Sequence, residues 1–457
     1  MAPSKQGKLD VLKSMREKVN WEIEDERHEF LSQLEPLIKY WNHRLPDLRD
    51  VFRKEEIDLL LRDSIDVRKI HGWRGHYYEG ERFIDFVMRC GYKDEPDFDE
   101  DGEPLLRRTT AVHRVARRKR DFFDDMFVMG SELVRRFFKI YDRFDVNYSD
   151  EDGLTHFHAA CHYGCYEELE KFLELGQDPN CLPRESNASS VDPPLHTAIK
   201  NNKEMFKFLL ENGADPTVVN AKGLTLLHSL CASDDNSYKL VTFFELIDDA
   251  QKKVSIDLLD KFGRTPLQWA VEINYEGDPT YKKWSPEPNK LGLASQALIV
   301  IERLEERGYQ LNRSGALTVM TFFSKHELFE KSTDLEKYNL YDDEEFLVKA
   351  KEMMINSNLS LYDLIRLRPE QAKQLKYEDY YVLAEPCKLR KLTKECKNAC
   401  YVHLSEKIFR GFFRQWALDL FLELTGYQLP ILCSEIIIKQ LNNQDLSNMC
   451  LAVVGQI

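Results

Sequence analysis

Residues 152–180, DGLTHFHAACHYGCYEELEKFLELGQDPN, and residues 192–216, DPPLHTAIKNNKEMFKFLLENGADP, align as one unit. In each, a short helical pattern carrying [LF]-H-x-A is followed by a break, a second apolar helix and a G-x-D-P turn. Self-similarity at a fixed period is typical of repeat proteins, because a unit that cannot bury its apolar face alone must stack on a copy of itself. The alignment therefore predicts a solenoid of stacked helix pairs.

Further copies of the unit lie on both sides of these two. RRTTAVHRVARR (107–118), KGLTLLHSLC (222–231) and FGRTPLQWAV (262–271) repeat the first helix. An earlier second helix that ends near Gly91 precedes an acidic hairpin, and a last degenerate unit is predicted near 314–329. The spacing varies between copies, and the largest insertion is predicted at 274–290. The array is expected to cover roughly 60–330.

The unit resembles the ankyrin repeat, with its T-P-L-H-x-A-A first helix and its L-L-x-x-G-A-D-x-N ending. In that pattern the Thr can cap the first helix, and a ring nitrogen of the His can bond backbone of the neighbouring repeat. A glycine ends a helix in the left-handed conformation. The positions of this chain that correspond to the motif are His113, Thr155, His158, Gly164, His196, His228, Thr265 and Pro266.

The stretch GLTHFHAACHYGC (153–165) offers a second interpretation as a zinc site. His158, Cys161, His162 and Cys165 would share one helical face, and zinc prefers imidazole and thiolate ligands. The repeat already explains these residues by position, although His156 stands where Pro is usual. We therefore predict no metal and no cofactor here, and none at the looser group Cys387, Cys396, Cys400 and His403.

Composition and net charge indicate which partners the chain could bind and in which compartment it would lie. The 457 residues carry a net charge of −14 and 43% hydrophobic residues. An acidic chain is a poor ligand for nucleic acid or anionic membrane, and no apolar run is long enough for a transmembrane helix. Ten cysteines in a chain of this length do not form a disulfide framework, so a reduced, cytoplasmic or nuclear protein is expected. The basic run 107–120 is read as a charge-balanced surface, with a nuclear signal or phosphate-binding stripe as the alternative.

The ends of the chain differ from the array. Residues 1–60 predict helices that cap the first repeat, with a coiled-coil arm as the alternative. Residues 331–355 are a connecting segment. In residues 356–457 the repeat is lost, and an amphipathic helix over 405–426 precedes Leu429-Pro430 and an isoleucine-rich helix.

This ending resembles an F-box core, and behind ankyrin repeats it resembles a PRANC domain, which ends ankyrin proteins of poxviruses, some endosymbionts and parasitoid wasps. The resemblance implies an all-α chain: an ankyrin α-solenoid with an N-terminal helical cap and a C-terminal F-box-like module. It also implies docking to a Skp-type adaptor of a cullin–RING ubiquitin ligase. The docking residues it selects are Leu429, Pro430, Ile437, Leu441, Asp445 and Leu446.

Enzyme signatures such as the P-loop, the dinucleotide-binding glycine motif, G-x-S-x-G and H-E-x-x-H do not occur in the sequence. We therefore predict a non-enzyme in which the array binds a target protein, still unknown, while the C-terminal module recruits the ligase. The alternative is a plain ankyrin scaffold, or an inhibitor that sequesters a Rel-type transcription factor, with a purely structural C-terminus.

Overall fold

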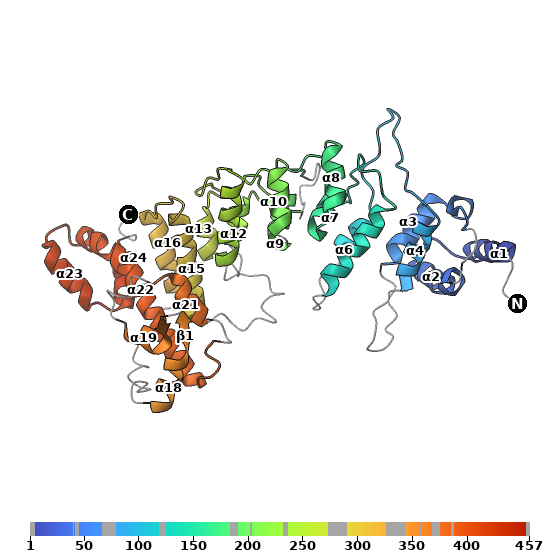
Figure 1. The fold of residues 1–457 in the computed structure, drawn as a ribbon. Coiled ribbons are helices and arrows are strands. Elements are labelled where there is room, and N and C mark those ends of the chain that lie inside the picture. The colour runs from blue at the N-terminus through green and yellow to red at the C-terminus, as the bar shows by residue number, and fades with distance from the viewer. Residues whose placement is uncertain are drawn as a thin grey trace. The chain divides into compact units, whose positions relative to one another are not determined.

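The computed structural model divides into two compact units, residues 1–221 and 222–457, and each is considered by itself (Figure 1). The structure describes residues 5–39, 41, 45–65, 79–117, 125–182, 191–201, 203–231, 236–272, 290–325, 343–356, 358–367, 375–384 and 388–453. The predicted insertion at 274–290 lies almost wholly outside these residues. Helices account for nearly all regular structure in the described part, as the all-α prediction requires.

The first unit consists of helices joined by turns. Its elements are α1 (Lys5–Arg16), α2 (Glu24–Lys39), the 3-10 turn η1 (Leu48–Asp50), α3 (Lys54–Asp63), α4 (Glu79–Arg89), α5 (Ala111–Ala116), α6 (Asp125–Phe138), α7 (His156–Tyr163), α8 (Tyr166–Glu174), α9 (Pro194–Asn201) and α10 (Lys203–Glu211). Short first helices pack on one another, as α5 on α7 and α7 on α9. This is the stacking that the repeat pattern predicts.

The N-terminal helices are part of the first unit's core. Helix α1 ends at Arg16 and α2 begins at Glu24, so the two do not form one continuous arm. Leu12, Phe30 and Leu34 are buried, and α2 packs on α3 and α4. The described helices do not form one continuous coiled-coil arm, and the cap remains a prediction.

A partly buried ion-pair network connects α3 with the first repeat of the array. Arg108 Nε donates to Asp58 Oδ2 at 2.9 Å, and Arg108 Nη2 lies 3.0 Å from Asp94 Oδ1. Tyr148 Oη donates to Asp94 Oδ2 at 2.7 Å. Burial raises the pKa of Asp58 although the guanidinium opposes this. Arg117 pairs with Asp150, so Arg108 and Arg117 of the basic run each bind a carboxylate within the unit.

The second unit continues the repeats and then changes character. Its elements are α11 (Leu226–Cys231), α12 (Asn236–Asp249), α13 (Pro266–Glu272), α15 (Lys290–Glu305), α16 (Arg313–Lys325), α18 (Glu344–Glu352), β1 (Met354–Asn356), β2 (Leu359–Ser360), α19 (Leu361–Arg366), α21 (Tyr377–Ala384), α22 (Lys394–Leu424), α23 (Ile431–Gln440) and α24 (Asn443–Ala452). Helix α16, the predicted degenerate unit, packs on α13 as first helices do.

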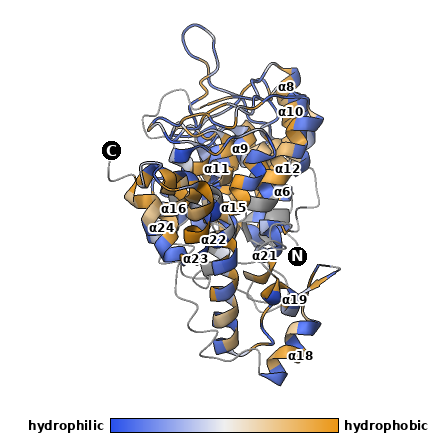
Figure 2. Ribbon diagram, turned by 90° about the vertical axis from the view of Figure 1, so that its left-hand side faces the viewer, coloured by the Kyte–Doolittle hydropathy of each residue, from blue (hydrophilic) through white to orange (hydrophobic). Residues whose placement is uncertain are grey.

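The last helices close over α16. Helices α16, α22 and α24 carry many apolar residues and pack together (Figure 2). The ring of Phe323 on α16 lies 4.5 Å from that of Phe409 and 5.9 Å from that of Phe412 on α22. Helix α22 begins eleven residues before the predicted start at 405, because Thr393 caps it by accepting from Cys396 N. The domain boundaries read from the sequence remain predictions, since the division into units falls within the repeats.

Candidate protein-interaction site

The capping threonine and the motif histidine form one unit at the start of α5, α7 and α11. Thr155 Oγ1 lies 2.8 Å from His158 Nδ1, and Thr225 Oγ1 lies 2.7 Å from His228 Nδ1. Thr225 N donates to the same His228 Nδ1 at 3.3 Å. A ring nitrogen that accepts here leaves its proton on Nε2, so the network assigns the neutral Nε2–H tautomer.

The second ring nitrogen of these histidines joins each repeat to the backbone that follows it. Nε2 of His113, His196 and His228 lies 3.0–3.1 Å from the carbonyl oxygens of Tyr148, Val218 and Arg264, respectively. The bond expected from the resemblance is therefore present at three repeats. Burial lowers the pKa of His113 and of His158 to about 4, so both rings are neutral at physiological pH.

His156, the residue that stands in place of the usual Pro, also has a structural role. It is buried, and its Nε2 lies 2.7 Å from Oγ1 of Thr110, the cap of the preceding first helix. The rings of Tyr141, Tyr148 and Phe138 stand edge-on to its ring. The histidine thus bonds the start of α7 to the cap of α5, which a proline could not do.

The cysteines of the same stretch are poor zinc ligands in this environment. Cys161 and Cys165 are buried. Burial raises the pKa of Cys161 well above its usual value and that of Cys165 to about 12. Zinc binds the thiolate, so a buried thiol that keeps its proton disfavours metal.

The predicted helix end at Gly164 is present in the structure. Gly164 ends α7 in the left-handed conformation, with φ of 67°.

The looser group of Cys396, Cys400 and His403 near the C-terminus is also used by a hydrogen bond and by burial. His403 Nε2 lies 3.0 Å from Ile365 O, at the end of α19. Burial raises the pKa of Cys400 to about 12. Cys387 lies outside the described residues. The described members of the group therefore support packing between α22 and α19.

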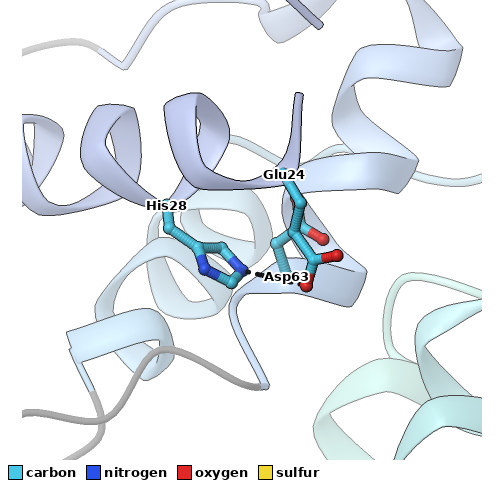
Figure 3. Close-up of side chains that lie close together, drawn as sticks. All are labelled: Glu24, His28 and Asp63. Atoms are coloured by element: carbon cyan, nitrogen blue, oxygen red, sulfur yellow. Dashed lines mark ion pairs between the residues drawn. The ribbon is translucent and has the colours of Figure 1, made fainter. Parts of the chain in front are cut away.

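Within the described residues, one group of three side chains has its ligand atoms close enough to suggest a cation. It consists of Glu24, His28 and Asp63 (Figure 3). His28 Nε2 lies 3.7 Å from Glu24 Oε1, but Asp63 Oδ2 already accepts from Arg27 Nε at 2.5 Å. Because the guanidinium neutralises Asp63 and Glu24 is exposed, the group is an ion-pair cluster, not a metal site.

We expect a strong zinc chelator to leave the helical circular dichroism and the melting temperature of the chain unchanged. The reason is that the His and Cys side chains named above are used by hydrogen bonds and burial. The measurement is thermal unfolding with and without the chelator, together with elemental analysis of the purified chain. A drop of several degrees, or one zinc per chain, would contradict this expectation.

The predicted docking residues separate into an exposed and a buried set. Pro430, Ile437 and Asp445 are exposed, and Leu429 and Leu441 are half-buried. Leu446 is completely buried, so it belongs to the core and not to an accessible surface. Its place follows from α24, which packs on both α22 and α16.

The structure adds residues that the sequence did not select. Ile431 (58% exposed), Leu432 (72%) and Ile436 (60%) lie beside Ile437 on α23. We call Ile431, Leu432, Ile436 and Ile437 the α23 face. The opposite side of the helix holds the buried Ser434 and Ile438. The run of isoleucines signalled an apolar helix, but it could not show which of them point outward.

A family model for ankyrin repeats matches residues 126–220 and 195–277, in three copies. The chain therefore contains ankyrin repeats, as the sequence predicts, and ankyrin repeats imply a protein-interaction role. None of the described helices is both long and apolar enough to cross a membrane.

Curated relatives share the repeat region. The chain is 33% identical over 133 residues to palmitoyltransferase AKR1 of Lachancea kluyveri, covering 29% of this chain and 17% of that one. It is 38% identical over 94 residues to BCL-6 corepressor-like protein 1 of Homo sapiens, covering 20% and 5%. It is 30% identical over 109 residues to an ankyrin repeat protein of Rickettsia felis, covering 23% and 47%. The chain thus spans under half the length of each of these relatives.

Proposed function

We propose that this chain is a non-catalytic adaptor in which the ankyrin array binds a target protein and the C-terminal module recruits a Skp-type adaptor of a cullin–RING ligase. The α23 face carries the proposal. Four neighbouring aliphatic side chains stand outward on one short helix of the last module. Apolar side chains gathered on one exposed surface commonly mark a protein interface.

The local construction of the module supports a docking role for this face. Pro430 precedes α23 as its N-cap, and Asn442 and Asp445 form a capping box that begins α24. The two helices are therefore fixed by their own caps and by α22, with Asn443 Nδ2 donating to Glu406 O at 2.8 Å. A face held on a rigid support loses little conformational entropy when it binds.

The scaffold alternative rests on a different observation. Helix α24 packs on α16, so the module also covers the end of the repeats, as a structural cap would. One relative is named a corepressor-like protein, and such a name would suit a chain that acts on a transcription factor, as the Rel-type inhibitor considered from the sequence would. In this alternative the α23 face has no adaptor partner.

The double change Leu432→Ser and Ile436→Ser distinguishes the two. Interface anchors commonly cost about 2 kcal/mol or more each, roughly thirtyfold in affinity, so adaptor and cullin should be lost from pull-downs. The melting temperature should not change, since both side chains already face water. The matched control is Val348→Ser on α18, an equally exposed aliphatic residue that should keep adaptor recovery.

Loss of adaptor and cullin with the double change, at an unchanged melting temperature, supports the ligase adaptor. If the unaltered full chain recovers neither protein, the scaffold alternative holds. If the double change lowers the melting temperature sharply, the face is internal packing and the docking surface does not exist.

A further inference from the structure

Two neighbouring turns of the second unit, residues 222–224 and 259–264, form one surface. A Cβ added to Gly223 would lie 3.0 Å from Lys261 Cβ, so the two turns touch where one of them has no side chain. Gly223 and Gly263 both have positive φ, 75° and 76°, which lets each turn reverse tightly. Both turns immediately precede first helices, α11 and α13.

An aromatic side chain stands exposed on this surface, yet it is held in place. Phe262 is 68% exposed. Lys261 Nζ lies 5.2 Å, and the guanidinium carbon of Arg264 5.0 Å, from the centre of its ring. Arg264 also lies 4.4 Å from the ring of Trp269 and pairs with Asp260 at 3.0 Å. A large apolar group fixed this way has the character of an interface anchor, because little entropy is lost on binding.

The charge of the surface is positive. Lys222 and Lys261 are exposed, and Leu259 beside them is 61% exposed. The carboxylate of Asp260 is bound within its own turn. It accepts from Trp269 Nε1 at 2.7 Å and from the backbone N of Phe262 and of Arg264 at 2.8 Å. Its negative charge is therefore held inside the turn.

The corresponding turn of the first unit has the opposite sign. Residues 150–153 read DEDG, and Glu151 and Asp152 are exposed. The repeat places both turns before a first helix, with Gly at a positive φ in each. A cationic, aromatic turn is therefore not a requirement of the fold, and it stands out in a chain of net charge −14.

We propose that Lys222, Leu259, Lys261 and Phe262, here called the basic turn surface, bind an acidic segment of a partner protein that carries one large apolar side chain. The lysines would attract the carboxylates, and Phe262 and Leu259 would contact the apolar group. This inference rests on the proposed function, in which the repeats hold a target protein. It adds the chemistry of the segment that is recognised.

The test is selection of a random 12-residue peptide library on the full-length chain, repeated on Phe262→Ala and on Lys222→Glu with Lys261→Glu. Peptides enriched on the unaltered chain should be acidic with an aromatic or aliphatic residue. A synthetic copy of the most enriched peptide should bind the Phe262 variant about tenfold or more weakly. Its binding should also weaken as salt is raised. Val348→Ala is the matched control and should keep the unaltered affinity.

Several results would overturn the inference. These are enrichment of neutral or basic peptides, equal binding by the variants, no enrichment at all, or binding of a 12-nucleotide single-stranded DNA in place of peptide. Equal melting temperatures for all variants show that the chain has not unfolded. Adaptor recovery through the α23 face is measured separately. If the chain recovers no adaptor but still selects acidic peptides, only the proposed function is contradicted. If the chain recovers the adaptor but selects no acidic peptide, only this inference is contradicted.

Discussion

Lowering the pH from 7 to about 4.5 should unfold the ankyrin repeats, because several neutral imidazoles are buried in them. Burial lowers the pKa of His113 and His158 to about 4, against an ordinary value of 6.5, and lowers that of the neighbouring His156 well below it. Between these values the unfolded chain binds protons that the folded chain does not. Stability is therefore fully present above pH 6.5 and is lost as the pH falls toward 4.

The size of the effect follows from the same difference. A histidine that titrates near pH 4 when folded and near pH 6.5 when unfolded costs about 3 kcal/mol over that interval. His113 and His158 together reach the lower end of the stability of a typical domain, about 5–15 kcal/mol, and His156 adds to the loss. The raised pKa of Asp58 acts in the opposite direction, since its carboxyl gains a proton more readily in the folded chain. Circular dichroism at 222 nm against pH measures the balance.

The chain itself supplies a control for this prediction. At α13 the histidine position holds Gln268, whose Oε1 accepts from Thr265 N at 2.8 Å. A glutamine can therefore accept the same hydrogen bond from the cap residue as the histidine does, without an ionisable side chain. His158→Gln should shift the acid transition to lower pH, while Glu151→Gln, at an exposed position, should not. An acid midpoint unchanged by His158→Gln would show that this ring does not control the transition.

Replacing Arg108 should cause a large loss of stability at neutral pH. Its guanidinium contacts both Asp58 and Asp94 inside the first unit. Arg108→Met keeps most of the volume but leaves two carboxylates without their cation. Removing one partner of a fully buried pair costs about 3–5 kcal/mol, and the partial exposure of Arg108 and Asp58 should place this loss at the lower end. The measurement is urea unfolding at pH 7.5.

The control adds Asp58→Asn to Arg108→Met. If the loss comes from an uncompensated carboxylate, neutralising Asp58 should restore part of it, so the two changes should not be additive. Arg143→Met is a second control, because Arg143 pairs with Asp145 on the surface and should cost less than about 1 kcal/mol. Equal losses for the single and double variants would show that Arg108 acts through packing and not through charge.

The sequence by itself determined the repeat and the local chemistry that repeats with it. Thr155 and Gly164 could be assigned as cap and helix end, because these roles depend on neighbours within a few residues of the chain. The start of α23 after Pro430 and the end of α22 near Gly426 were readable for the same reason. Periodicity likewise marked α22 as amphipathic.

Tertiary structure alone decided which distant residues meet and which side of a helix is left uncovered. His156 bonds Thr110 across 46 positions, and Arg108 bonds Asp58 across 50. Leu446 and Ile437 are both aliphatic residues of the C-terminal module, yet only Ile437 is exposed. Local pattern cannot supply such facts, because burial depends on where another helix packs. The side of α23 left without a neighbour is therefore known only once α22 and α24 are placed around it.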